Sequence, residues 1–136
     1  NDRVEACKLF MENICLNRDI VLKMELCEEN PSVKMDTSLF EQVLINVIKN
    51  SAESIEETGH ILIRTSAEPL MLEVSDDGKG IAKEVEIKLF SPFFSTKPNG
   101  QGIGLIFIRE VLMKHGCTFS LRTYEDGITR FRICFP

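Results

Sequence analysis

Apolar and polar positions along the chain predict alternating helices and strands. The longest helical pattern runs from Asp36 to Glu57, where Asp36 can cap the first turn and apolar residues return every three or four positions. The resulting stripe consists of Phe40, Val43, Leu44, Val47, Ile48, Ser51 and Ile55. We therefore expect this helix to bury one face in the core.

Further patterns surround this helix. An amphipathic helix is predicted from Asp2 to about Cys15, and a second strong helix from Ile103 to Lys114, closed by Gly116. Period-two alternation predicts the strands. They run from Ile20 to Leu26, His60 to Ala67, Leu70 to Ser75, Thr118 to Tyr124 and Ile128 to Phe135, with a brief strand at Val33 to Met35. This order predicts an α+β protein, a two-layer sandwich with a mixed, mostly antiparallel sheet and about three helices on one face.

Length and composition limit what the chain can be. Its 136 residues, 43% of them apolar, fit one globular domain over residues 1–136. A net charge of −5 without a basic block argues against nucleic-acid binding, and no apolar run is long enough to span a membrane. Five scattered cysteines without metal-ligand spacing are typical of buried thiols in a reducing compartment. We expect a cytoplasmic domain cut from a longer protein.

Two asparagines share one edge of the long predicted helix. Asn46 and Asn50 are four residues apart, which places them together at the border of the apolar stripe. Ordinary surface amides are one interpretation. Alternatively they line a pocket, because Mg²⁺ prefers oxygen ligands, keeps several waters and bridges to nucleotide phosphates. Asn50 is then a candidate magnesium ligand and Asn46 a residue that orients the site.

Asp76 closes an apolar strand and is followed at once by Asp77, Gly78, Lys79 and Gly80. A simple Asx turn is one interpretation. A carboxylate only accepts hydrogen bonds, so at the mouth of a strand it can pair with the exocyclic amine of adenine and would repel the carbonyl of guanine. Glycines allow the backbone to approach a base closely. The stretch therefore predicts either a turn or an adenine pocket.

A second glycine cluster, Gly100 to Gly104, leads into the helix at Ile103. Amide groups and the dipole at a helix N-terminus favour phosphate. No strand precedes the cluster closely and the phosphate-loop lysine signature is absent, which argues against the common dinucleotide and P-loop folds. Lys97, just before the cluster, is either a solvated loop residue or a point charge for terminal phosphates.

Together these segments resemble the ATP-binding catalytic domain of sensor histidine kinases, in the superfamily shared with gyrase B, the heat-shock ATPase chaperones and MutL. Four motifs stand in the family's order and spacing, and Gly127 to Ile133 is similar to its last strand. They are the N box (Asn46 to Asn50), the first glycine box (Asp76 to Gly80), the F box (Phe90 to Lys97) and the second glycine box (Gly100 to Gly104). The resemblance covers Asp36 to Pro136 and implies a Bergerat-type fold. The F box most resembles the nitrogen-regulation kinases.

The resemblance implies a role for each motif. Asn50 would bind Mg²⁺ with support from Asn46, Asp76 would recognise adenine, and Lys97 would lie in a mobile lid near the phosphates. Asn46, Asn50 and Lys97 would be the catalytic residues. Contacts to ATP are implied for these and for Gly78, Gly80, Ile81, Phe90, Phe94, Thr96, Gly100, Gln101, Gly102, Ile103, Gly104, Leu105 and Thr129.

Three positions depart from the family's pattern. Asp77 stands where the family often has Asn, and Gln101 where it often has Thr, but neighbouring backbone carries those contacts. Glu53 stands where many relatives have a basic residue. The triphosphate would therefore be gripped more by the lid than by the long helix.

Neither histidine resembles the family's phosphoacceptor, which an acidic residue usually follows in a helical hairpin. His60 lies in a predicted strand and His115 at a helix end, so both are expected to be structural. The resemblance then implies transfer of the γ-phosphoryl of ATP·Mg²⁺ to a histidine on a separate dimerisation domain, with a response regulator as partner and a homodimeric, in some cases membrane-anchored, parent. A non-catalytic nucleotide-binding module stays an alternative. An ATP hydrolase is disfavoured, because such relatives usually carry a glutamate base at the position of Asn46.

Overall fold

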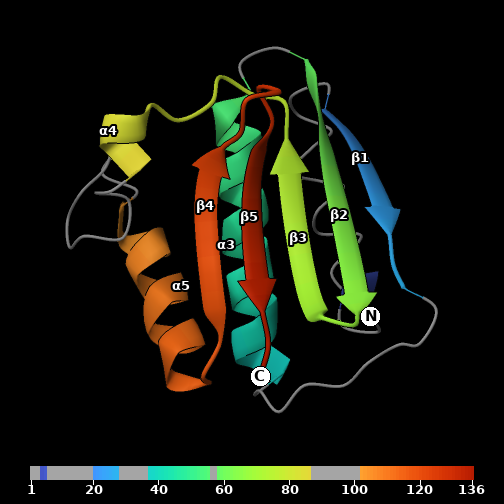
Figure 1. Cartoon of the computed structure of the whole chain (residues 1–136), viewed down its shortest axis with the longest axis vertical. Coiled ribbons are helices and arrows are strands. Elements are labelled where there is room, and N and C mark those ends of the chain that lie inside the picture. The colour runs from blue at the N-terminus through green and yellow to red at the C-terminus, as the bar shows by residue number, and fades with distance from the viewer. Residues whose placement is uncertain (1–3, 6–19, 28–36, 56–57, 87–101) are drawn as a thin grey trace.

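The computed structural model describes residues 4–5, 20–27, 37–55, 58–86 and 102–136, and its centre is a five-stranded sheet (Figure 1). The strands are β1 (Ile20–Glu25), β2 (Gly59–Ala67), β3 (Leu70–Asp76), β4 (Thr118–Thr123) and β5 (Thr129–Cys134). Their order across the sheet is β1-β2-β3-β5-β4; β1 and β2 are parallel, and the other neighbours are antiparallel. The predicted mixed, mostly antiparallel sheet is confirmed.

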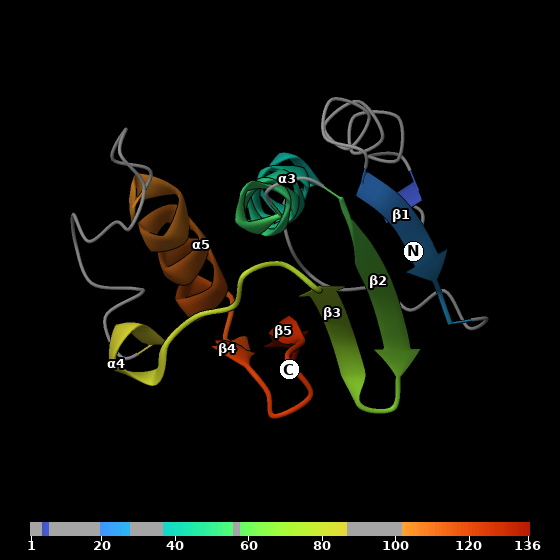
Figure 2. The ribbon, with the colours of Figure 1, turned by 90° about the horizontal axis from the view of Figure 1, so that it is seen from above.

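Two long helices, α3 (Thr37–Ser54) and α5 (Gly102–Lys114), lie on the same face of the sheet, as Figures 1 and 2 show. A single turn, α4 (Lys83–Glu86), follows β3. The described residues thus show two long helices on this face, rather than about three. Of the first predicted helix only residues 4 and 5 are described, and both are helical; residues 33–36, predicted as a brief strand and helix cap, lie outside the described ranges. None of the described helices has the length and apolar character needed to cross a bilayer.

The apolar stripe predicted for the long helix forms the centre of the core. All of its members are buried except Phe40, which is half-buried. The sheet contributes the side chains that point toward the helices, and α5 completes the cluster. These partners are Ile61, Ile63, Leu72, Val74, Phe131 and Ile133 from the sheet, and Leu105, Ile108, Val111 and Leu112 from α5. Each large side chain that is fully buried contributes about 1.5–3 kcal/mol, so this interface holds α3 firmly on the sheet.

The end of α3 differs from the prediction. The helix ends at Ser54 and not at Glu57, and β2 begins at Gly59, one residue before its predicted start at His60. The carbonyl of Ser54 accepts a hydrogen bond from the backbone N–H of Lys79 at 3.0 Å. A Cβ on Gly59 would lie 2.7 Å from Oδ1 of Asp77. The segment after β3 therefore packs on the end of the helix, and glycine is required at the start of β2 for that close approach.

The C-terminal end of α5 agrees with the prediction. Gly116 has a positive φ of 73°, and the backbone N–H of Cys117 donates to the carbonyl of Leu112 at 2.9 Å. These features are typical of a helix that ends on glycine. The ring Nδ1 of His115 donates to the carbonyl of Val111 at 2.7 Å, which agrees with the structural role expected for this histidine.

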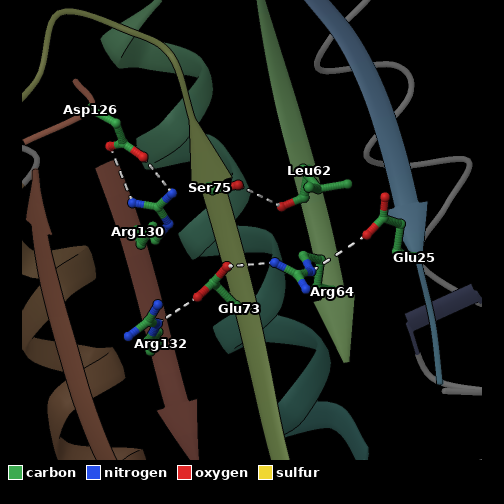
Figure 3. Close-up of polar contacts among 8 residues, drawn as sticks. All are labelled: Glu25, Leu62, Arg64, Glu73, Ser75, Asp126, Arg130 and Arg132. Carbon is green, nitrogen blue, oxygen red and sulfur yellow. Dashed lines mark hydrogen bonds and ion pairs between the residues drawn. The ribbon is translucent and has the colours of Figure 1, made fainter. Parts of the chain in front are cut away.

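The sheet face turned away from α3 and α5 carries a row of ion pairs (Figure 3). Glu73 of β3 is only 3% exposed and lies between two arginines. Its Oε2 is 2.5 Å from Nε of Arg132 on β5, and its Oε1 is 3.9 Å from Nη1 of Arg64 on β2. Arg64 in turn approaches Glu25 of β1 at 3.5 Å. Charged side chains thus bridge four strands on this face.

Candidate functional site

Asp76, the last residue of β3, is a buried carboxylate that is 4% exposed. Its Oδ1 accepts hydrogen bonds from the hydroxyl of Ser54 at 2.9 Å and from the backbone N–H of Gly78 at 3.0 Å. Burial raises the pKa of Asp76, and the donors on Gly78, Ser54 and Ser51 oppose that rise. Across the described ranges, no cation lies within ion-pair distance of it. Among the residues that the structure describes, those that hold this carboxylate are therefore neutral donors.

The turn after Asp76 is fixed to its surroundings by a second carboxylate. Asp77 accepts a hydrogen bond from the backbone N–H of His60 at 2.7 Å on Oδ1, and from its ring Nδ1 at 2.8 Å on Oδ2. Burial alone would raise the pKa of Asp77, but the hydrogen bonds and charge of His60 lower it. His60 thus anchors the turn to β2, in agreement with the structural role expected for it.

The asparagines lie on the edge of α3 that leads to Asp76. Asn46 and Asn50 are both half-buried, as expected for residues at the border of the apolar stripe. Ser54 follows four residues after Asn50 and continues the same edge, about 12 Å along the axis from Asn46. Because the hydroxyl of Ser54 bonds to Asp76, the polar edge of the helix ends on the buried carboxylate.

Two threonines tie the loop after β3 to the C-terminal strands. The backbone N–H of Ile81 donates to Oγ1 of Thr123 at 2.7 Å, and that oxygen lies 2.7 Å from Oγ1 of Thr129. Thr129 is buried and is the register partner of Asp76 in the sheet. Gly80 has a φ of 80°, and a Cβ there would lie 3.3 Å from the side chain of Thr123. This loop therefore needs glycine both for its backbone conformation and for its packing.

The structure places part of the predicted site in one region. Asp76, Gly78, Gly80, Ile81 and Thr129 surround the end of β3, and the edge of α3 with Asn46 and Asn50 leads to it. The second glycine box begins α5, whose backbone starts at Gly102, and Leu105 is buried. The remaining candidates lie outside the described residues. They are Phe90, Phe94, Thr96, Lys97, Gly100 and Gln101.

Three residues of this region were not predicted as site residues: Ser51, which was expected only as a member of the buried stripe, Ser54 and Thr123. A signal existed for Ser54, because it repeats the four-residue spacing of Asn46 and Asn50. No local signal existed for Thr123, since its contact with Ile81 joins residues 42 positions apart.

The described side chains fit a magnesium ion that is shared with a ligand. The described part of the chain contains no group of three or more His, Cys, Asp or Glu residues that could hold a metal by themselves. Mg²⁺ on a nucleotide needs only one or two protein oxygens, because phosphates and waters complete its shell. Asn50, on a half-buried helix edge, carries an amide oxygen of the kind that such a site uses.

Residues 35–136 match the family described as histidine kinase-, DNA gyrase B-, and HSP90-like ATPase. The sensor histidine kinase ZraS of Escherichia coli O157:H7 is 31% identical over 121 residues, which cover 88% of this chain and 26% of ZraS. The sensory histidine kinase/phosphatase NtrB of Rhodobacter capsulatus is also 31% identical over 121 residues, covering 78% of this chain and 34% of NtrB. The chain thus spans about a quarter to a third of these relatives.

Solved structures agree with this result. The nucleotide-free catalytic domain of histidine kinase ThkA matches the whole chain with a TM-score of 0.89 at 29% identity, and 92% of that domain is covered. The predicted α+β sandwich and the predicted family are both confirmed. The chain belongs to the histidine kinase-, DNA gyrase B- and HSP90-like ATPase family, and its relatives there are sensor histidine kinases.

Proposed function

We propose that this chain binds ATP with Mg²⁺ and transfers the γ-phosphoryl group to a histidine on a separate domain. The buried carboxylate of Asp76 is the observation that carries the proposal. The hydroxyl of Ser54 and the backbone N–H of Gly78 both donate to Oδ1, and in this proposal Oδ2 accepts from the exocyclic amine of adenine. Guanine presents a carbonyl at that place, which an ionised carboxylate would repel.

The edge of α3 and the start of α5 support the rest of the nucleotide site. In this proposal Asn50 ligates Mg²⁺ through its amide oxygen and Asn46 orients the site. The metal, when bound, neutralises charge that develops on the phosphates. The N-terminus of α5 offers backbone donors to the phosphates, and Lys97 offers a point charge. Positioning and electrostatics dominate phosphoryl transfer, so no nucleophile from this chain is required.

The acceptor histidine is assigned to another part of the parent protein. Both histidines of this chain already bond to neighbours, His60 to Asp77 and His115 to the carbonyl of Val111. Residues 1–136 are then one catalytic domain in the cytoplasm. The parent protein would be a homodimer with a separate dimerisation and phosphoacceptor domain, and a response regulator would receive the phosphoryl group.

Calorimetric titration with ATP and GTP, each with and without Mg²⁺, tests nucleotide binding. We expect magnesium-dependent binding of ATP and weak competition by GTP. Equal affinity for the two nucleotides would remove the adenine role from Asp76.

A second experiment tests transfer. The chain is joined to a matching phosphoacceptor domain, and label from γ-labelled ATP is followed onto the histidine. Retention of ATP without labelling would indicate a nucleotide-binding module, and steady phosphate release by the isolated chain would indicate an ATP hydrolase.

A further inference from the structure

Ser54, the last residue of α3, approaches the end of β3 and the turn after it at three points. Its hydroxyl oxygen lies 2.9 Å from Oδ1 of Asp76, and its carbonyl accepts from the N–H of Lys79 at 3.0 Å. A Cβ on Gly78 would lie 2.3 Å from that same hydroxyl oxygen, so the turn packs directly on it. Both the side chain and the backbone of Ser54 therefore position the segment that carries Asp76.

The hydroxyl of Ser54 has two acceptors within reach but only one proton to donate. Its oxygen is also 2.8 Å from the carbonyl of Ser51. When Asp76 is ionised, donation to the carboxylate is favoured, because a bond to a charged acceptor is stronger. When Asp76 is protonated, the hydroxyl can donate to Ser51 and accept from the carboxyl group. The contact between Ser54 and Asp76 is therefore compatible with both protonation states.

This contact determines which carboxylate oxygen faces a ligand. Ser54 and the N–H of Gly78 both bond to Oδ1 and so restrict rotation of the carboxylate. Without Ser54, Oδ1 would lose one of these two donors, and the carboxylate, held otherwise by the N–H of Gly78 and the side chain of Ser51, would be less restrained. A buried carboxylate with fewer donors also protonates more readily, and a protonated carboxyl can donate to the carbonyl of guanine.

We propose that Ser54 is a positioning residue for nucleotide selectivity, which holds the carboxylate of Asp76 so that Oδ2 accepts a hydrogen bond from adenine. The inference rests on the proposed function, because it concerns the base that the same site selects. It also gives α3 two roles. Asn50 and Ser54 lie one turn apart on one edge, so one rigid helix positions the groups proposed for the metal and for the base.

The test compares Ser54→Ala with Ser38→Ala, an exposed serine at the other end of the same helix. Alanine favours helix and removes only the hydroxyl. For Ser54→Ala we expect ATP affinity near neutral pH to fall about 5- to 10-fold, as for loss of one hydrogen bond of ordinary strength. We expect the preference for ATP over GTP to fall as well, and Ser38→Ala to change neither.

Two further measurements separate positioning from a merely structural role. The pH at which ATP binding is half lost on acidification should rise in Ser54→Ala. The carboxyl signal of Asp76, followed by carbon NMR in the nucleotide-free chain, should titrate at higher pH in this variant. Asp77 is the charged group that acts on Asp76 among the described residues; it is paired with His60, and both are unchanged in the variant.

The outcomes distinguish this inference from the proposed function. If the wild-type chain binds no ATP, the proposed function fails, whatever the variants do. If the wild type binds ATP and Ser54→Ala keeps the same affinity, base preference and pH midpoint, the role of Ser54 is overturned while the proposed function stands. An unchanged titration of Asp76 in the nucleotide-free variant would also contradict it.

Discussion

Two carboxylates on one strand, Glu73 and Asp76, are both buried but have different surroundings. They are 3% and 4% exposed and point to opposite faces of the sheet. Glu73 lies between Arg132 and Arg64 on the face away from the helices. Asp76 faces α3, and its described partners are the hydroxyls of Ser54 and Ser51 and the backbone N–H of Gly78. The same chemical group is thus paired with charge on one face and with neutral donors on the other.

This difference indicates that Glu73 has a structural role, whereas Asp76 belongs to a binding site. A buried charge is costly unless cations or many donors compensate it. Two arginines compensate the charge of Glu73, so no ligand donor is needed for that purpose. The burial cost of Asp76 is only partly offset, as its raised pKa indicates, and it keeps an oxygen that a ligand donor can complete. Substitutions at the two positions should therefore affect different properties.

The largest effect is expected for Asp76→Asn. The amide keeps the shape but loses the charge and presents a donor, so ATP affinity should fall on the order of 30- to 150-fold, as for a hydrogen bond to a charged group worth about 2–3 kcal/mol. The free energy of unfolding should stay the same or increase, because a buried charge is removed. Calorimetry and urea denaturation measure the two quantities. If the variant is less stable but binds ATP with unchanged affinity, Asp76 has a structural role like that of Glu73 and does not bind the nucleotide.

Gly78→Ala should produce the next largest effect. The new Cβ would lie 2.3 Å from the hydroxyl oxygen of Ser54 and 2.6 Å from its carbonyl oxygen, and a backbone oxygen cannot rotate away. The turn must shift, at a cost of about 2 kcal/mol in unfolding free energy, and ATP affinity should fall with it.

Gly127→Ala is the matched control for this substitution. Unlike Gly78, Gly127 has a positive φ, 81°, and a Cβ there meets nothing within 4 Å, so this position tests backbone strain without a steric contact. We expect a cost of about 1 kcal/mol from backbone strain and no change in ATP affinity. Equal effects of the two substitutions on ATP affinity would mean that contact with Ser54 is unimportant.

Glu73→Gln should have a smaller effect, confined to stability. The amide still accepts hydrogen bonds but no longer compensates Arg64 and Arg132, whose side chains are 56% and 41% exposed. Water screens charges at that exposure, so we expect a loss of about 1 kcal/mol in denaturation experiments and unchanged ATP affinity. A drop in ATP affinity like that of Asp76→Asn would abolish the distinction between the two faces.

Local patterns in the sequence predict much of this arrangement. The stripe of α3, the strands β2 and β3, and the placement of Asn46 and Asn50 on one edge follow from periods of 3.6 and 2. Asp76 was identifiable because it closes an apolar strand before a glycine turn. Such features involve residues only a few positions apart in the sequence, and the pattern of apolar residues reports on that range.

Contacts between distant segments were not predictable in the same way. The bonds from Ser54 to Asp76 and from Arg132 to Glu73 join residues 22 and 59 positions apart. The end of α3 at Ser54 also depends on a contact between distant segments, because the carbonyl of Ser54 accepts a hydrogen bond from Lys79 in the segment after β3. Glu73 looks like an ordinary polar residue within an apolar strand, and only the register of β2, β3 and β5 places two arginines beside it.

The smallest expected effect is a pH dependence with opposite signs for stability and for binding. Burial raises the pKa of Asp76, so the folded chain holds this proton more tightly than the unfolded chain. Its contribution to stability is complete below the unfolded pKa and is lost as pH rises through the folded pKa, with a slope no larger than about 1.4 kcal/mol per pH unit. ATP binding needs the ionised form and should strengthen over the same interval.

Urea denaturation of the wild type and Asp76→Asn across this interval isolates the effect, because other titrating groups, including Asp77 and His60, are common to both. The wild type should lose stability relative to the variant as pH rises, while its affinity for ATP increases. The opposite trend in stability would mean that folding favours the ionised form of Asp76. That carboxylate would then be as well compensated as Glu73, and the contrast between the two faces of β3 would disappear.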